Sequence, residues 1–256
     1  MIFRTLTIAL AALLLWAGTA SAEPTRLTVR VMAKDAKFIG TSIGGARITI
    51  RDVDTGELLA QGVTEGSTGN TEKLVEDDRE RGVRLSSRGS AEFTTTLDIT
   101  EPRQVEITAY GPLAQRHAAA RASVTHWLVP GKHVSAADGV ILELPGFIVD
   151  ILSPPGNVTL GDLPVDVPLK VNVTMMCGCL VQPDGLWDAD KYEVVALVRR
   201  DGASEGKYAL EYAGRPSQFM LDMTVHKTGL YDVIVYAYDS LTGNTGLDRV
   251  TFRVTE

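Results

Sequence analysis

Apolar and polar residues alternate along most of the chain from Leu27 onward, in short runs separated by Gly, Pro, Asp and Asn. The runs are rich in Val, Ile and Thr, and an alternation of period two is typical of β-strands with one buried face. The pattern predicts seven strands in the first half of the chain, at residues 27–33, 46–53, 58–64, 92–99, 104–110, 121–129 and 139–144. It predicts seven more in the second half, at residues 147–152, 167–177, 192–200, 207–212, 218–226, 231–239 and 248–254. Only residues 113–122, which are rich in alanine, favour a short helix.

Seven short strands separated by turn residues are typical of one β-sandwich of about 100 residues. The two series meet at Leu144-Pro145-Gly146, where one strand ends and Phe147 opens the next alternating run. The sequence therefore predicts an all-β protein with two tandem immunoglobulin-like or prealbumin-like β-sandwiches, at residues 23–145 and 146–256.

Residues 1–22 have the composition of a cleaved signal peptide. Arg4 gives a short basic region, residues 6–16 are apolar, and Ala20-Ser21-Ala22 supplies small residues for cleavage. The apolar run is too short for a spanning helix, which needs about 20 residues. We therefore expect a periplasmic or secreted protein that does not span a membrane, in a compartment where disulfides persist.

Composition and charge narrow the classes of partner. Of the 256 residues, 45% are hydrophobic and 22% are charged, which is ordinary for a globular protein. The 25 Lys and Arg against 32 Asp and Glu give a net charge of −7, and no basic stripe follows the chain. This balance lacks the electrostatic footprint of nucleic-acid binding, so we expect no nucleic-acid partner.

Residues 42–50 and 54–60 resemble the opening hairpin of carboxypeptidase-regulatory, transthyretin-like domains, with Asp54-Thr55-Gly56 as the turn. The resemblance covers about 25 residues. It implies a sandwich whose usual work is binding or spacing. A polar insertion at residues 65–91 departs from the pattern of these domains.

The second half resembles immunoglobulin-like domains through residues 229–233, followed by Val235 and Ala237. The resemblance implies that Tyr231 is a corner tyrosine, whose hydroxyl bonds back to the preceding backbone. Val233 stands where those domains carry a cysteine of the inter-sheet disulfide, so apolar packing must hold the sheets together.

Both cysteines lie in Met175-Met176-Cys177-Gly178-Cys179. If the strand continues through Cys179, residues 175, 177 and 179 share one face. The motif leaves four alternatives open. The cysteines can be a buried core pair with or without a bridge, soft ligands for Cu(I), a redox-active disulfide between Cys177 and Cys179, or an intermolecular link.

The pair Cys177 and Cys179 with the trailing Gln182 is similar to the copper-delivery protein of cytochrome oxidase assembly, although that family has an aromatic residue where Gly178 stands. The resemblance implies a Cu(I) site on these cysteines. His226, near Met220 and Met223 in sequence, completes such a site with Met175 or Met176 if its strand lies beside the cysteines.

The main hypothesis is a noncatalytic, exported binding or structural protein of the cell envelope, without a cofactor and with a protein partner that the sequence does not identify. The alternative is a periplasmic copper-binding or thiol-redox protein that uses Cys177 and Cys179. No paired carboxylates, phosphate-binding loop or zinc-binding histidine pair favours an enzyme.

Overall fold

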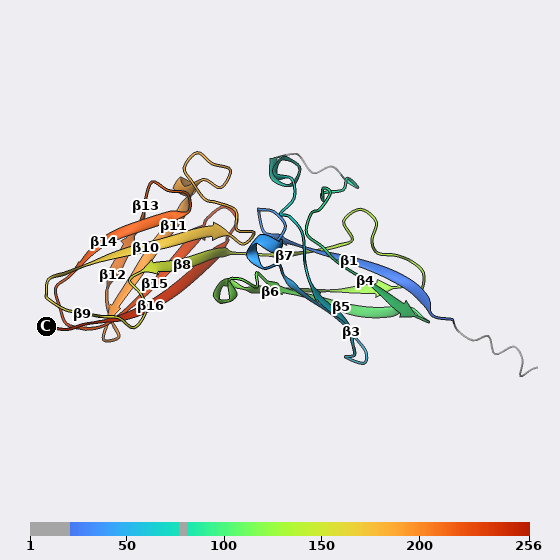
Figure 1. The fold of residues 1–256 in the computed structure, drawn as a ribbon, viewed down its shortest axis with the longest axis horizontal. Helices are drawn as coiled ribbons and strands as arrows, with labels where there is room; N and C mark the ends of the chain where they lie inside the picture. Colours follow the sequence, from blue (N-terminus) through green and yellow to red (C-terminus); the bar gives the residue numbers. More distant parts are fainter. Residues whose placement is uncertain (1–20, 77–80) are drawn as a thin grey trace, which may run out of the picture.

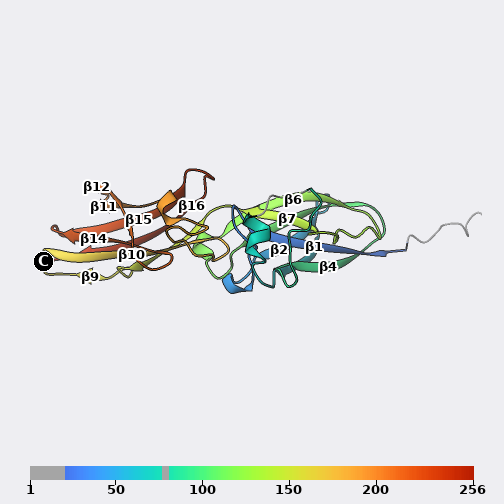
Figure 2. The ribbon, with the colours of Figure 1, turned by 90° about the horizontal axis from the view of Figure 1, so that it is seen from above.

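A computed structural model describes residues 21–76 and 81–256. This part of the chain folds into two β-sandwiches that lie end to end, with Glu23 and the C-terminus at opposite ends (Figure 1). The view from above shows the two layers of sheet in each sandwich (Figure 2). The signal peptide expected at residues 1–22 lies almost wholly outside the described residues and stays a prediction, as do the domain limits. Within the described chain, none of the helices has the length and hydropathy that a membrane-spanning helix needs.

The strands follow the predicted runs closely. Those of the first sandwich are β1 (Glu23–Ala33), β2 (Arg47–Asp52), β3 (Leu58–Val63), β4 (Phe93–Ile99), β5 (Arg103–Gly111), β6 (Ala120–Leu128) and β7 (Val140–Leu144). Those of the second are β8 (Phe147–Ser153), β9 (Thr159–Leu160), β10 (Val165–Met175), β11 (Tyr192–Arg200), β12 (Ala203–Ala209), β13 (Glu211–Tyr212), β14 (Gln218–Val225), β15 (Gly229–Asp239) and β16 (Thr245–Val254). The short helices are η2 (Thr41–Ile43), η3 (Glu72–Glu76), η4 (Arg116–Ala118) and η5 (Ala189–Lys191).

In the first sandwich, the sheet β4-β1-β7 faces the sheet β3-β2-β5-β6. Strand β1 runs antiparallel to β4 and parallel to β7. Every residue of β1 from Leu27 onward is buried, so this strand is covered on both faces. The core between the sheets covers one face, and the insertion covers the other.

The described parts of the insertion, residues 65–76 and 81–91, pack against β1 through both apolar and polar groups. Leu74 of η3 forms a small buried cluster with Met32, Phe38 and Ala91. Arg30 is 2% exposed and donates to the carbonyls of Ser90 and Ala91, both at 2.9 Å. Arg30 thus binds backbone groups of the insertion from the centre of β1. A segment of polar composition can therefore still pack in a fixed position on this strand.

The second sandwich places the sheet β13-β14-β10-β8 against β12-β11-β15-β16-β9. Tyr231 stacks on Phe252, with 5.3 Å between ring centroids, and its hydroxyl donates to the carbonyl of Lys227 at 2.9 Å. This is the backbone contact of a corner tyrosine. Val233, in the position of the missing cysteine, is fully buried. Apolar packing therefore joins the two sheets at this point.

Several local predictions were wrong. The single strand predicted at residues 207–212 is divided between β12 and β13, which lie in different sheets. Residues 113–122 do not form an α-helix, because Ala120 already pairs with Gly111 in the β5–β6 ladder and only η4 remains helical. Tertiary pairing overrides the helix propensity of alanine here. Strand β10 ends at Met175 and not at Cys177. The two-residue strand β9 was not predicted, since two residues carry no alternation.

Candidate functional site

The two sandwiches are joined by a linker of only two residues, because β7 ends at Leu144 and β8 begins at Phe147. The amide of Gly146 donates to Asn244 Oδ1 at 2.9 Å, and Asn244 Nδ2 donates to the carbonyl of Lys34 at 3.2 Å. Asn244 is fully buried. One side chain of the second sandwich thus binds both the linker and the end of β1.

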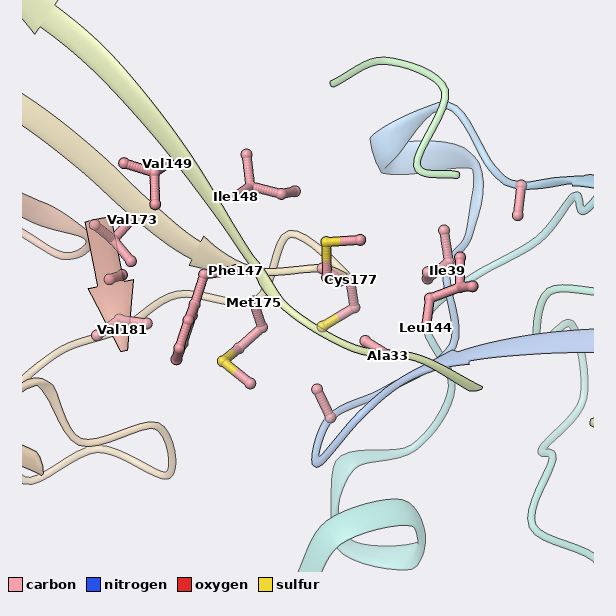
Figure 3. Packing of buried hydrophobic residues seen from close by; sticks show 14 of the residues in the cluster. Ala33, Ile39, Leu144, Phe147, Ile148, Val149, Val173, Met175, Cys177 and Val181 are labelled. Atoms are coloured by element: carbon pink, nitrogen blue, oxygen red, sulfur yellow. The ribbon is translucent and has the colours of Figure 1, made fainter. Parts of the chain in front are cut away.

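An apolar cluster continues across this junction. Ala33, Ile39 and Leu144 of the first sandwich lie on one side of Cys177, and Phe147 and the end of β10 lie on the other (Figure 3). All of these side chains are buried in one continuous core cluster. Domains move relative to each other by default unless their interface is well packed and apolar, so this packing favours one fixed arrangement.

Polar contacts of two side chains, Trp187 and His117, hold the edge of the junction. The indole nitrogen of Trp187 donates to the carbonyl of Asp35 at 2.9 Å. On η4, His117 Nε2 lies 2.9 Å from the carbonyl of Val149 and 3.2 Å from Asp150 Oδ1. Burial raises the pKa of Asp150, His117 opposes the rise, and Asp248 adds to it. Contacts from β8 and from the loop that carries Trp187 therefore reach the first sandwich.

The cysteine motif forms a tight turn beside the junction. After β10, the amide of Gly178 donates to the carbonyl of Met175 at 2.8 Å, and the amide of Met175 donates to the carbonyl of Cys179 at 3.1 Å. A disulfide joins Cys177 and Cys179, whose Cα atoms are 5.4 Å apart. The strand does not continue through Cys179, so residues 175, 177 and 179 do not share the face of one strand. Gly178 bends the chain because its φ of 76° is one that glycine adopts without strain.

This turn lies against the first sandwich. A Cβ added at Gly178 would lie 3.5 Å from Ile43 Cδ1, in ordinary van der Waals contact. The turn and the loop that follows it form one wall of a cleft of about 520 Å³ between the sandwiches, and residues 37–76 supply the other wall. The side chains that line the cleft include Lys37, Thr71, Glu76, Cys177, Cys179, Leu180, Leu186 and Trp187.

The cleft combines apolar and charged groups. Leu180 is 56% exposed and Leu186 is 46% exposed. Opposite them, Lys37 Nζ donates to Thr71 Oγ1 at 3.0 Å, and Glu76 lies on the same wall. The second sandwich therefore presents apolar groups, and the first presents polar ones.

The residues proposed for Cu(I) do not assemble into a site. Cys177 and Cys179 are bridged and offer no thiolate, and Met175 and Met176 are fully buried in the core. His226 follows Val225, which pairs with Val165 at the opposite end of β10 from Met175. These ends are ten residue steps apart along the strand, or about 33 Å. The prediction that His226 completes a site with the cysteines is wrong, and the donor set does not fit the metal.

The described residues also contain no group of three or more His, Cys, Asp and Glu side chains placed to hold a metal ion. The cysteine motif could be identified from the sequence, but the contribution of residues 37–76 and the position of Trp187 could not. A tryptophan within a polar loop was the available signal, because such a ring needs an apolar surface to cover it.

No family model and no curated protein matches the sequence. Among solved structures, the chain is similar to fibronectin(III)-like modules of Clostridium thermocellum CbhA, with 11% identity, 93% of this chain and 92% of that chain covered, and a TM-score of 0.30. It is also similar to titin domains Z1Z2, solved in complex with telethonin, with 13% identity, coverage of 91% and 88%, and a TM-score of 0.26. A third likeness, to an engineered protein, has 18% identity and a TM-score of 0.33, and covers 50% of this chain and 24% of that one. At these values, the likenesses say nothing about what this chain binds.

Proposed function

We propose that this chain is an exported, noncatalytic module of the cell envelope that holds a protein partner in the cleft between its two sandwiches. One observation carries the proposal. The cleft is built from both sandwiches, and the junction beside it is closed by buried apolar packing and by Asn244. A site assembled from two domains keeps its shape only if the domains do not move, and this junction supplies that condition. The composition of residues 1–22 supports export.

The exposed leucines support a protein as the partner. Exposed apolar side chains that gather at one place and are rimmed by polar residues mark sites of protein–protein contact. Leu180 and Leu186 are exposed beside the ring of Trp187, which is already fixed by its bond to Asp35. Lys37 and Glu76 on the facing wall are suited to a polar rim.

Site-specific photocrosslinking in the intact envelope tests the proposal. A photoreactive residue at Leu186 is expected to give a discrete adduct with one protein, and Leu180→Asp is expected to remove it. Leu247 is 58% exposed on β16 and serves as the matched control position. No adduct from position 186, or the same adduct from position 247, would contradict a partner in the cleft.

Thiol–disulfide exchange is a second candidate function, favoured by the position of Cys177 and Cys179 in the wall of the cleft. Reduction of this bridge would take two electrons and two protons and give two thiols. Equilibration of the full chain in glutathione buffers, followed by thiol counting, measures the reduction potential. A value below about −300 mV would mark the bridge as structural and remove this candidate.

A further inference from the structure

The outer face of the sheet β3-β2-β5-β6 has a surface that the cleft does not involve. Figure 1 shows these strands on the side of the first sandwich away from the insertion. On this face, Arg47 of β2 lies opposite Tyr110 of β5, and Tyr110 lies opposite Arg121 of β6. The three side chains therefore form a row across adjacent strands.

Tyr110 holds a guanidinium from each neighbouring strand. The Cζ of Arg47 lies over the ring at 5.3 Å from its centroid, and the Cζ of Arg121 at 5.7 Å. Both contacts are cation–π interactions, which use the flat face of a guanidinium and leave its N–H edges free. Among the described residues, neither guanidinium forms an ion pair or a side-chain hydrogen bond.

One ring thus keeps two positive charges close together, and neither has an ion-pair partner among the described residues. Like charges at short range raise the free energy of the unliganded protein, and an anion between them removes this repulsion. Arg51 lies on the same face of β2, but it stands opposite Glu106 of β5 and donates to the carbonyl of Gly56, so the excess positive charge rests on Arg47 and Arg121. Glu106 is the one acidic side chain in the lining of this hollow. A net positive surface of this kind, on a chain of charge −7, points to a negatively charged ligand.

The remaining groups on the face indicate the class of ligand. The hollow has a volume of about 470 Å³, and its other lining groups include the hydroxyls of Thr49 and Thr108 and the amide of Gln61. No aliphatic side chain lines the hollow, so a ligand there meets polar groups and the ring of Tyr110. Trp127 stands further along β6 on the same face and is 59% exposed.

We propose that this face, defined by Arg47, Tyr110 and Arg121, binds an anionic polysaccharide through its carboxylates. Arginine N–H edges match carboxylates in a bidentate geometry. The threonine hydroxyls and the glutamine amide suit the hydroxyl groups of sugars. The ring of Trp127 is placed to pack on another sugar of the same polysaccharide. This site is distinct from the cleft and does not depend on the function proposed for it.

Titration calorimetry with the full chain tests the proposal, with polygalacturonate as the probe and its methyl ester as the uncharged match. We expect the acid form to bind, the ester not to bind, and the affinity for the acid form to fall as salt is raised. The double variant Arg47→Gln/Arg121→Gln is expected to bind at least about tenfold more weakly. Tyr110→Leu removes the ring that holds both guanidiniums and is expected to weaken binding as well.

Arg253→Gln, an exposed arginine on β16, is the matched control and is expected to bind as the unaltered protein does. Thermal melts check that each variant is folded. The proposal is overturned if the acid form does not bind, if the ester binds equally, or if Arg253→Gln weakens binding as much as the double variant. It is also overturned if polyglutamate binds as tightly as polygalacturonate, or if phosphatidylglycerol vesicles bind and the polysaccharide does not.

Discussion

The indole nitrogen of Trp187 donates a hydrogen bond to the carbonyl of Asp35 at 2.9 Å, across 152 positions of sequence. Trp187 is 8% exposed. The bond connects a loop of the second sandwich to the turn that follows β1 of the first sandwich. The loop that carries Leu180 and Leu186 is therefore held from both sides, by this bond and by the disulfide turn.

Trp187→Phe keeps an aromatic ring at the junction but removes the donor. We expect the free energy of unfolding to fall by about 1 kcal/mol, because the carbonyl of Asp35 loses a partner in a partly buried position. Urea unfolding measures the change. Trp127→Phe, on the exposed face of β6, is the control and is expected to change little. Equal effects for the two variants would mean that the bond to Asp35 contributes nothing.

Asn244→Ala leaves two groups at the junction without a partner, the amide of Gly146 and the carbonyl of Lys34. An unsatisfied buried polar group costs about 1–3 kcal/mol, so this variant is expected to be among the most destabilising at the junction. Hydrogen exchange at the Gly146 amide is expected to speed up. Leu241→Ala, an 88% exposed residue in the same turn, is the control. Unchanged exchange at Gly146 would refute the linking role of Asn244.

The double variant Cys177→Ser/Cys179→Ser is expected to fold and to lose about 1.6 kcal/mol of unfolding free energy, since the bridge closes a loop of only three residues. The hydrogen bonds of the turn at Met175 remain available to hold its shape. Urea unfolding under oxidising conditions measures the loss. A variant that fails to fold would show that the bridge, and not the apolar packing, holds the junction.

The contacts of Asp138 predict that part of the free energy of unfolding depends on pH. Burial alone would raise the pKa of Asp138, but hydrogen bonds from the amides of Leu85 and Ser86, at 2.7 and 2.8 Å, and the charge of Arg30 hold it below its usual range. A carboxyl whose folded pKa is lowered stabilises the protein above its unfolded pKa of about 3.9. That contribution is lost as the pH falls through the lower folded pKa.

The unaltered protein is therefore expected to exceed Asp138→Asn in unfolding free energy. This difference is expected to be largest at neutral pH and to shrink below about pH 4. Thermal melts across this range measure it. Asp98→Asn, on the exposed side of β4, is the matched control for the loss of one surface carboxyl. A difference for Asp138→Asn that stays constant down to pH 2 would show that its carboxyl is not held by these contacts.

Local patterns allowed most of the strands and the corner contact of Tyr231 to be predicted, because alternation and a short motif report on neighbouring residues. The turn at Gly178 ended β10 two residues early, and alternation carries no signal for such a bend. The error at His226 arose because register is not readable from one strand: Val225 pairs with Val165, at the far end of β10 from the cysteines. The row of Arg47, Tyr110 and Arg121 likewise depends on the register of three strands.

The central claim is that the two sandwiches form one body with a fixed cleft between them. Residual dipolar couplings of the full chain in one alignment medium test it most directly. A single alignment tensor is predicted to fit the amides of residues 23–144 and 147–254 together. Two tensors of clearly different magnitude for the two sandwiches would mean that they move independently, and would contradict the claim.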